Sequence, residues 1–496
     1  MTGRIFYPTS SKDSVSLFGR HGFGDKRLEA RHKKLLSQLS ENQSSVIYQL
    51  RDGRKAQGGA YRFLNNDKVS LSELIARTCA WDLGNCGDRD LLVAIDSTSV
   101  KLKTGSKDKH EQVKSVGVLE DNRTPGFFLV PSLLIDKKTH QTLGLGDILH
   151  YTRPLIEGSK EQKQQGRAQR RKLELQDKEA GMWSIVAQNT AKGLQQARSM
   201  TFVMDQGGDK YESLQQILEC TNQNFIVRVK EDRQAVSTTD QTQGHFSDLL
   251  ATQCWMDVRH VAIRSLNHYS KSSGKWVQRK ARKALLTIRY ITLRLERPSS
   301  YSKHKKLLDK PLCLVEVLEH SSTVPPGESP IHWRLLTTWT IDELQKAWQV
   351  VSAYQARWNI EQLFRILKKQ GFDIENSQLQ NPKSIKKLTV MALKASEQAL
   401  RLSTARDGRD FAPIESMFDQ TQQQLLIKLN AKLSGQTPKI INPHANNSLA
   451  WAAWIIARLG GWSGYKTQRP PGPITMSKGL TQFYAFFDFY NLIDGT

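Results

Sequence analysis

The chain carries, at residues 354–368, the stretch Tyr354-Gln-Ala-Arg357-Trp-Asn-Ile-Glu361-Gln-Leu-Phe-Arg365-Ile-Leu-Lys368. At about 100° per residue of an α-helix, Tyr354, Arg357, Glu361 and Lys368 fall within one stripe about 60° wide. The opposite side is apolar and is expected to pack on a core. It carries Ala356, Ile360, Leu363 and Leu367. The pattern predicts a helix over about residues 342–370 that sets one acid among a phenol and two cations.

Two further acids directly follow apolar runs. Asp96 follows Leu91-Leu-Val-Ala-Ile95, and Asp205 follows Thr201-Phe-Val-Met204. Such runs are typical of strands buried on both faces. Carboxylates suit Mg²⁺, and two such ions about 3.5–4 Å apart can activate a nucleophile and stabilise the leaving oxygen of a phosphodiester. Asp96, Asp205 and Glu361 are therefore the candidate catalytic and metal-ligating residues, although Asp205, beside two glycines, could instead cap the next helix.

Charge points to a polyanionic partner. The chain has 496 residues, a net charge of +24 and a pI near 9.7. The basic residues are spread along the whole chain, which favours an extended nucleic-acid surface over a localisation signal. A basic protein that is merely soluble is the alternative. The length predicts about two to four domains.

Several classes of site have no support in the sequence. The five cysteines form no C-x-x-C pair, and the histidines form no H-x3-H or H-E-x-x-H pattern. No Walker-type or Rossmann glycine motif occurs in a strand–helix context, so no nucleotide cofactor is expected. An apolar leader and a membrane-length apolar run are also missing, and we expect free thiols in a cytoplasmic protein with no membrane partner.

The distribution of apolar, charged and turn-forming residues along the chain predicts an α/β multidomain protein. Residues 1–72 carry 13 Lys/Arg against 6 Asp/Glu, with a basic amphipathic helix at 24–36 and a Gly-rich turn at 57–60. They are expected to form a helical DNA-binding domain, or else a solvated basic face. Further strands are predicted at 115–119, 127–135 and 224–230, a helix at 211–220, and a loop or exposed helix at 158–181.

The predicted catalytic domain spans residues 73–385 and contains an all-β insertion at 231–340. Its alternating segments at 284–295 and 312–318 are typical of antiparallel strands with one wet face, and another strand is expected at 331–338. Residues 386–496 are expected to be helical. They end in the aromatic stretch 483–493, which is too apolar to leave exposed.

The ordered set of motifs resembles bacterial insertion-sequence DDE transposases that carry a Tyr-Arg-Glu-Lys signature and cut through a DNA hairpin. The likeness runs nearly end to end. It rests on Gly24-Asp25-x-Arg27, Gly59-Ala-Tyr61-Arg62-Phe63, Ile95-Asp96-x-Thr98, Asp205-x3-Asp209, Phe225-x-Val227-Arg228-x-Lys230, Ala281-Arg-Lys-Ala, Trp333-x-Leu-Leu-Thr337, the signature itself, Ser448-Leu-x-Trp451 and Ile456-Ala-Arg-Leu-Gly-Gly461.

The resemblance implies an RNase H-like core in which Asp96, Asp205 and Glu361 bind Mg²⁺, with Mn²⁺ able to substitute. It implies nicking, hairpin formation by the freed 3′-OH, hairpin opening and strand transfer. The implied partners are double-stranded transposon-end DNA, target DNA and a second copy of the chain, with the C-terminal helix as dimer element. Each N-terminal domain would bind the end that the other subunit cuts, and the protein would associate with the nucleoid when DNA-bound.

The resemblance also implies DNA contacts. Trp333 would stack on a flipped base, although an alternating strand alone favours a core aromatic. Tyr354 and Arg357 would hold the neighbouring phosphate instead of acting as mere counter-ions of Glu361, so Arg357→Ala should impair hairpin formation and leave metal binding largely intact. Further contacts are expected from Arg62, Arg228, Lys230, Arg365 and Lys368.

Two rival functions stay open on the sequence. The first is a related RNase H-like nuclease that cuts without joining. The second is a catalytically silent DNA-binding inhibitor of transposition.

Overall fold

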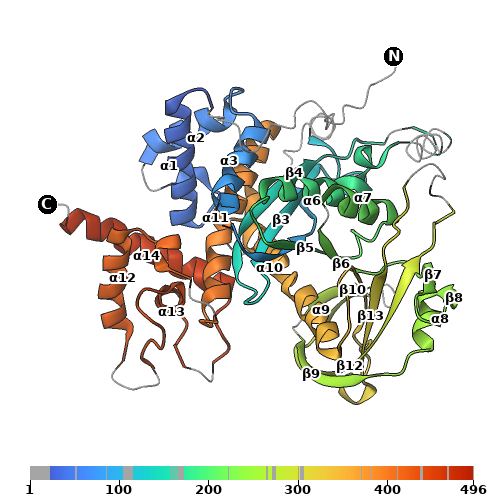
Figure 1. Cartoon of the computed structure of the whole chain (residues 1–496). Coiled ribbons are helices and arrows are strands. Elements are labelled where there is room, and N and C mark those ends of the chain that lie inside the picture. Colours follow the sequence, from blue (N-terminus) through green and yellow to red (C-terminus); the bar gives the residue numbers. More distant parts are fainter. Residues whose placement is uncertain are drawn as a thin grey trace. The chain divides into compact units, whose positions relative to one another are not determined.

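The computed structural model of the chain divides it into two compact units, which are described separately (Figure 1). Unit 1 comprises residues 1–200 and 357–496, and unit 2 comprises residues 201–356. The described residues are 23–50, 53–84, 86–103, 116–156, 158–159, 161, 164, 173–221, 223–263, 266–270, 275–299, 301, 306–369, 371–379, 381–409, 412–435, 440–465 and 468–494.

Unit 1 contains an antiparallel sheet organised around one long strand. Strand β3 (Gly126–Asp136) pairs with β1 (Asp90–Ile95), β2 (Thr98–Lys101) and β4 (Thr142–Tyr151). The predicted buried runs at 91–95 and 127–135 are confirmed, because nearly every residue of β1 and β3 is buried. The sequence does not predict strand β4, because its two glycines and its polar residues interrupt the apolar pattern.

Most helices of unit 1 pack around α11 (Pro382–Ala405), which contacts α1, α2, α3, α10, α13, α14 and β4. Its Lys394 binds the buried carboxylates of Asp82 and Glu397. The helices are α1 (Lys26–Asn42), α2 (Gly53–Asn65), α3 (Leu71–Gly84), α6 (Met182–Gly193), α10 (Trp358–Lys368), α12 (Gln420–Leu433), α13 (Leu449–Leu459) and α14 (Pro473–Asp494). The predicted domain limits stay a prediction, and the limit at 385 falls inside α11. No described helix combines the length and apolarity needed to cross a bilayer.

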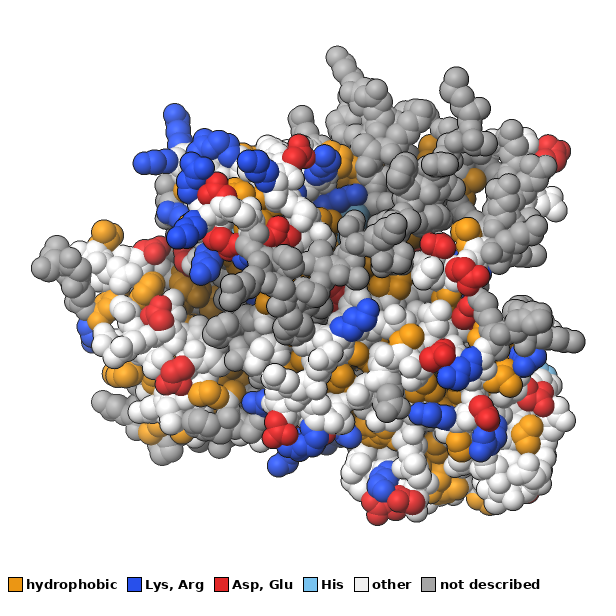
Figure 2. Space-filling view, turned by 45° about the horizontal axis from the view of Figure 1, so that its top comes forward, with side chains coloured by type: hydrophobic (Ala, Val, Ile, Leu, Met, Phe, Trp, Pro, Cys, Tyr) orange, Lys and Arg blue, Asp and Glu red, His pale blue; other side chains and the backbone are white. Residues whose placement is uncertain are grey.

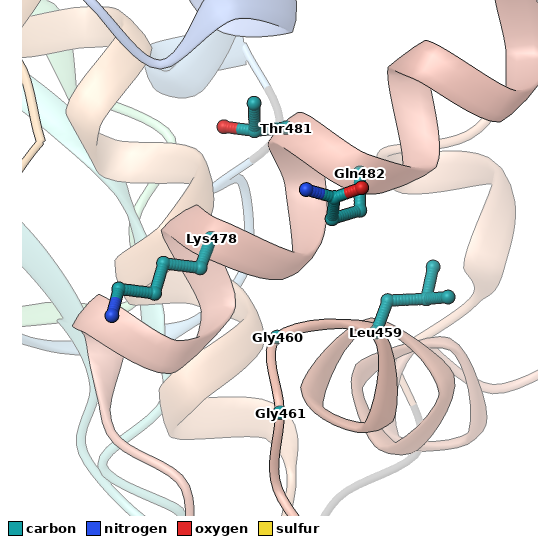
Figure 3. A pocket seen from close by; sticks show the side chains of 6 residues that line it. All are labelled: Leu459, Gly460, Gly461, Lys478, Thr481 and Gln482. Carbon is teal, nitrogen blue, oxygen red and sulfur yellow. The ribbon is translucent and has the colours of Figure 1, made fainter.

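Two glycine motifs allow close helix packing. The Gly-rich turn predicted at 57–60 is wrong, because these residues lie within α2. A Cβ on Gly59 would lie 2.5 Å from Cζ of Arg31 in α1, so the glycine is needed for close approach. Gly460 and Gly479 similarly bring α13 and α14 into backbone contact. Figure 3 shows the pocket of about 340 Å³ beside them, lined by Leu459, Gly460, Gly461, Lys478, Thr481 and Gln482.

Two predicted segments of unit 1 differ from the structure or lie largely outside its described residues. The strand predicted at 115–119 is wrong over its described part, where only Val118 forms an isolated bridge; Ser115 lies outside the described residues. The loop or exposed helix predicted at 158–181 lies largely outside them as well. Its described end forms short 3₁₀ turns at Leu175–Asp177 and Glu179–Gly181.

Unit 2 is built on a sheet in the order β5-β6-β14-β13-β12-β7-β8, with β9 also paired to β12. Only the β5–β6 pair is parallel among its described pairs. The strands are β5 (Ser199–Met204), β6 (Asn224–Arg228), β7 (Gln234–Ser237), β8 (Gln243–His245), β9 (Asp257–Ile263), β12 (Arg282–Leu295), β13 (Leu312–Glu319) and β14 (His332–Thr337). A separate hairpin joins β10 (Leu266–Ser270) to β11 (Lys275–Arg279).

Helices α7 (Tyr211–Thr221), α8 (Phe246–Ala251) and α9 (Leu344–Ala356) complete unit 2. The helix predicted at 211–220 is therefore confirmed. The insertion predicted as all-β is not entirely so, because it contains α8. Strand β12 alternates between buried and partly exposed residues as expected, but β13 is buried along nearly its whole length. A single wet face is therefore correct for β12 and wrong for β13.

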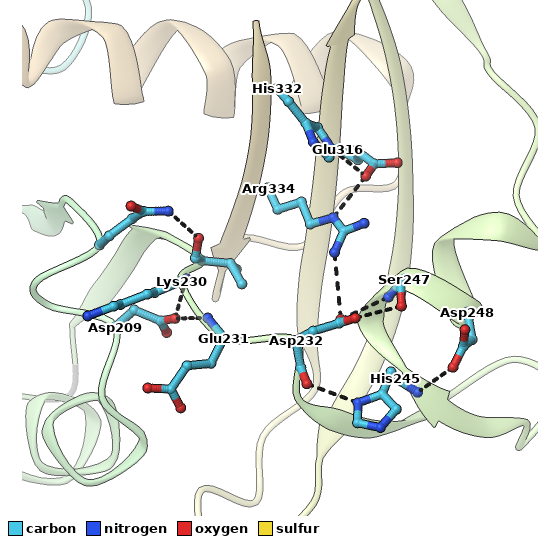
Figure 4. Close-up of polar contacts among 12 residues, drawn as sticks. Asp209, Lys230, Glu231, Asp232, His245, Ser247, Asp248, Glu316, His332 and Arg334 are labelled. Atoms are coloured by element: carbon cyan, nitrogen blue, oxygen red, sulfur yellow. Dashed lines mark hydrogen bonds and ion pairs between the residues drawn. The ribbon is translucent and has the colours of Figure 1, made fainter. Parts of the chain in front are cut away.

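A buried acid organises the centre of this sheet. Glu316 on β13 lies directly between Arg289 of β12 and Arg334 of β14. Its carboxylate accepts hydrogen bonds from Arg289 (2.7 Å), Arg334 (2.9 Å) and His332 (2.8 Å). Figure 4 shows Arg334 reaching from Glu316 towards Asp232, 3.6 Å away. One carboxylate therefore fixes three basic side chains on one face of the sheet.

We expect Glu316→Gln to destabilise this sheet in a pH-dependent way. Burial alone would raise the pKa of Glu316, but hydrogen bonds from His332, Arg334 and Arg289 outweigh it and lower the pKa to about 2 from 4.5. Because the folded pKa is the lower one, the stabilisation is complete above the unfolded pKa and is lost as pH falls towards 2. The substitution should cost about 3 kcal/mol at neutral pH, and the difference from wild type should shrink in acid.

Hydrogen exchange of the β13 amides measures this local free energy. Asp309→Asn is the matched control, because its ion pair with Arg294 is exposed and should change stability by less than about 1 kcal/mol. An acid-independent loss in Glu316→Gln would contradict the proposed charge pairing.

Candidate active site

The signature stretch forms two helices instead of the single helix predicted over residues 342–370. Helix α9 ends at Ala356, α10 begins at Trp358, and Arg357 between them keeps helical dihedrals (φ −53°, ψ −31°). The boundary between the two units also falls directly before Arg357. The apolar side is confirmed, since Ala356, Ile360, Leu363 and Leu367 are buried. Gln370 lies outside the described residues.

Arg357 bridges two of the candidate catalytic acids, both within unit 1. Its Nη1 lies 2.5 Å from Oδ2 of Asp96, and its Nη2 lies 2.6 Å from Oε1 of Glu361. Asp96 follows β1, whereas Glu361 lies in the first turn of α10, and 261 residues separate Asp96 from Arg357. The fold thus brings together two acids that the sequence keeps far apart.

The bridge is largely shielded from solvent. The side chains of Arg357, Asp96 and Glu361 are 8%, 13% and 30% exposed. Charge-assisted hydrogen bonds of this length are strong, and a shielded acid pair requires a cation between its members. In the DNA-free chain, Arg357 is thus a counter-ion of both Asp96 and Glu361, and its further role at a DNA phosphate stays a prediction.

Asp205 lies in unit 2, in the loop that follows β5. Its Oδ1 accepts a hydrogen bond from the backbone N–H of Gly207 at 2.8 Å, four residues before α7 begins. This contact closes the turn of Asp205 itself and does not cap α7. The side chain of the neighbouring Gln206 donates to the carbonyl of Val229, which ties this loop to the end of β6.

Asp209 fixes the same loop more firmly. It is fully buried and pairs with Arg233 at 2.6 Å. Its Oδ2 also accepts a hydrogen bond from the backbone N–H of Lys230 at 2.6 Å (Figure 4). Arg233 also donates to the Asp209 carbonyl. The sequence places Asp209 in the motif Asp205-x3-Asp209 but does not mark it as a site residue. Its partner could not be found from sequence, since a single arginine in a loop carries no periodic signal.

The two acids of unit 1 have the chemistry that a divalent ion needs. Carboxylate oxygens are preferred by Mg²⁺, and the guanidinium already marks a position where positive charge meets both groups. Asp96 also accepts the backbone N–H of Ser97 through Oδ1. Within the described residues, no group of three or more His, Cys, Asp or Glu is gathered tightly enough to hold a metal ion. Asp96 and Glu361 nonetheless fit such an ion as oxygen ligands.

The predicted DNA contacts differ in exposure. Within unit 2, Trp333 is half-buried and meets the buried ring of Tyr354 edge-on, with centroids 5.8 Å apart. Arg228 is half-buried and Lys230 is exposed. DNA binding by these residues stays a prediction.

In unit 1, Arg62 on α2 and Arg365 on α10 are exposed. Lys368 lies 3.8 Å from Glu375, and burial lowers the pKa of its ammonium. Glu375 also accepts the backbone N–H of Lys101, so Lys368 is held beside the end of β2.

Two family models match the chain. The model described as transposase DNA-binding matches residues 15–69, and the model described as transposase DDE domain matches residues 185–396. Together they support a transposase of the DDE class. The DNA-binding match contains α1 and α2, and the DDE match contains Asp205 and Glu361 but not Asp96. DDE transposases generally use divalent metal ions, and the DNA-binding match supports DNA as the partner of this chain.

Asp209→Ala should destabilise unit 2 by about 3–5 kcal/mol, because it leaves the guanidinium of Arg233 buried without its charge partner. Hydrogen exchange of the β6 amides would measure the loss. Lys210→Ala provides the control, since it removes the neighbouring but more exposed pair with Glu231 (3.0 Å) and should change stability by less than about 1 kcal/mol. Equal losses in the two variants would show that Asp209 has no special structural role.

Proposed function

We propose that the protein is a cut-and-paste DNA transposase of the hairpin-forming, Tyr-Arg-Glu-Lys type. It would nick each transposon end, form and open a hairpin, and join the freed 3′-OH to target DNA. The observation that carries this proposal is the convergence of Asp96 and Glu361 on Arg357, in a chain that matches transposase DNA-binding and DDE domains.

The catalytic core would be RNase H-like. The antiparallel order β2-β3-β1 in unit 1 and the parallel β5–β6 pair in unit 2 support this assignment. Asp96, Asp205 and Glu361 would hold two Mg²⁺ ions, which supply charge stabilisation and an activated nucleophile when bound. The three residues contribute carboxylate oxygens as ligands. In unit 1, the carboxylates of Asp96 and Glu361 both contact the guanidinium of Arg357, which marks one position for a cation.

DNA would be held by aromatic and basic side chains that both units supply. Trp333 and Tyr354 already form an aromatic pair, one member of which is half-exposed and able to stack on a flipped base. Arg228, Lys230, Arg365 and Lys368 would contact phosphates, which position a duplex without reading its sequence. Arg357 would join them at the phosphate beside the cut.

The helical N-terminal domain would bind the transposon end. Figure 2 shows Lys and Arg side chains gathered over α1 and α2. The exposed residues of these helices include Lys26, Arg27, Lys33, Lys34, Arg54, Lys55 and Arg62. Positive charge concentrated in this way attracts the DNA backbone and makes binding salt-dependent.

We expect Asp96→Asn, Asp205→Asn and Glu361→Gln each to abolish Mg²⁺-dependent nicking, by at least about a hundredfold, while leaving DNA binding intact. The substrate is a duplex that carries the inverted repeats flanking the gene, and products are resolved on denaturing gels. Asp88→Asn is the control, because its side chain is 88% exposed and should leave the rate unchanged.

Three outcomes decide between the proposal and its rivals. Nicked, hairpin and joined products that depend on all three acids support the transposase. Cutting without joining to a target plasmid would leave the nuclease, and DNA binding without any cutting would leave the inhibitor.

A dimer interface is expected on α14. Three of its apolar side chains are strongly exposed, namely Phe486 (46%), Phe489 (63%) and Leu492 (74%). Such a cluster on one helix is costly unless a second copy covers it. Phe489→Glu with Leu492→Glu should convert the dimer to a monomer in sedimentation experiments. Ile441→Glu, at a separate site that is 50% exposed, should leave the dimer intact.

A further inference from the structure

Arg357 cannot hold both acids and a DNA phosphate in the conformation observed. Its side chain is 8% exposed and both of its terminal nitrogens contact carboxylates. A phosphate would have to approach the same guanidinium nitrogens, because Arg recognises phosphate through its planar N–H donors. With only 8% of the side chain exposed, a phosphate can reach these donors only if the guanidinium moves from its place between the two acids.

The oxygens that Arg357 contacts are also those that a metal ion would need. Asp96 Oδ2 and Glu361 Oε1 both accept hydrogen bonds from the guanidinium. One guanidinium carries one positive charge against two carboxylates, whereas a divalent ion would balance both. Guanidinium and metal ion would therefore compete for the same pair of oxygens.

We propose that Arg357 is an exchangeable cation that couples DNA binding to metal loading. In the DNA-free protein it holds Asp96 and Glu361 together and hinders metal entry. When transposon-end DNA binds, the guanidinium moves to a phosphate, and the two carboxylates become free to take a divalent ion. This inference rests on the proposed function and adds regulation to it. Protein that has not bound transposon-end DNA would bind the divalent ion weakly and would therefore not cut.

The position of Arg357 in the chain suits such an exchange. It lies where the helical hydrogen bonding is interrupted between α9 and α10, and its φ and ψ stay in the helical region. The side chain can therefore change partner without rebuilding either helix. Glu361 remains fixed in the first turn of α10, whose buried face includes Ile360 and Leu363.

Linkage gives the proposal a quantitative form. If DNA removes a competitor of the metal ion, DNA raises metal affinity, and metal raises DNA affinity by the same factor. Coupling of this kind typically amounts to about fivefold to 150-fold. Removal of the competitor by substitution should raise metal affinity in the absence of DNA and abolish most of the coupling.

The experiment measures Mn²⁺ binding to the full chain by electron paramagnetic resonance, with and without transposon-end duplex. Arg357→Gln should bind Mn²⁺ at least about fivefold more tightly than wild type in the absence of DNA. Added duplex should raise the affinity of wild type and leave that of Arg357→Gln nearly unchanged. The double substitution Arg357→Gln, Glu361→Gln should lose the gain, which assigns the ion to this site.

Arg77→Gln is the matched control. Arg77 also bridges two carboxylates, Glu29 at 2.5 Å and Glu73 at 3.3 Å, and is partly buried. Its loss should leave Mn²⁺ affinity unchanged. Thermal unfolding of the DNA-free proteins, with and without Mn²⁺, provides a second readout, because added Mn²⁺ should raise the melting temperature of Arg357→Gln more than that of wild type.

An unchanged or weaker Mn²⁺ affinity in DNA-free Arg357→Gln would overturn the proposal. The proposal would also be overturned if Arg357→Gln bound Mn²⁺ more tightly but added duplex did not change the Mn²⁺ affinity of wild type. If Arg357→Gln does not fold, Arg357→Lys replaces it, since lysine lacks the fork that spans both acids, and unchanged affinity there is equally contrary. If neither wild type nor any variant bound the duplex, the result would count against the proposed transposase. The Mn²⁺ affinities of wild type and Arg357→Gln without DNA would still decide whether Arg357 competes with the metal ion.

Discussion

A charge removed from water must find a partner, and this constraint shapes each buried polar centre of the chain described here. Glu316 gathers two arginines and a histidine, Asp209 takes Arg233, and Lys394 joins Asp82 to Glu397. The candidate active site follows the same rule, with one arginine between two acids. Because these centres pair acids with roughly equal numbers of bases, the net charge of +24 remains on the rest of the chain.

These centres differ in what the pairing achieves. The pairs of Glu316 and Asp209 are geometrically closed by several hydrogen bonds each, so they stabilise strand ends and loops. The Asp96–Arg357–Glu361 bridge is charge-unbalanced and its Glu361 side chain is the most exposed of the three. Lys394 also lies between two acids, but the side chains of Asp82 and Glu397 are each only 1% exposed. The solvent access of Glu361 therefore distinguishes the Arg357 bridge, and it suits a site that exchanges partners.

Sequence patterns predicted those strands and helix faces that depend on residues close together in the chain. The continuous apolar runs of β1, β3 and β5 and the apolar side of the signature helices follow from local periodicity, and the structure confirms them. Strand β4 and the helical course of α2 were not predicted, because their glycines serve contacts with distant elements such as Arg31. The Arg357 bridge was also missed, since 261 residues separate it from Asp96 and no local pattern encodes that distance.

The signature stretch has a further consequence that periodicity alone conceals. Tyr354 packs beside Trp333 in unit 2, whereas Arg357 and Glu361 belong to unit 1, and only two residues separate Tyr354 from Arg357. A helix repeating every 3.6 residues suggests one functional face, but the chain divides that face between two compact units. The signature thus joins, through a short covalent path, the aromatic pair suited to a flipped base and the acids suited to phosphodiester chemistry.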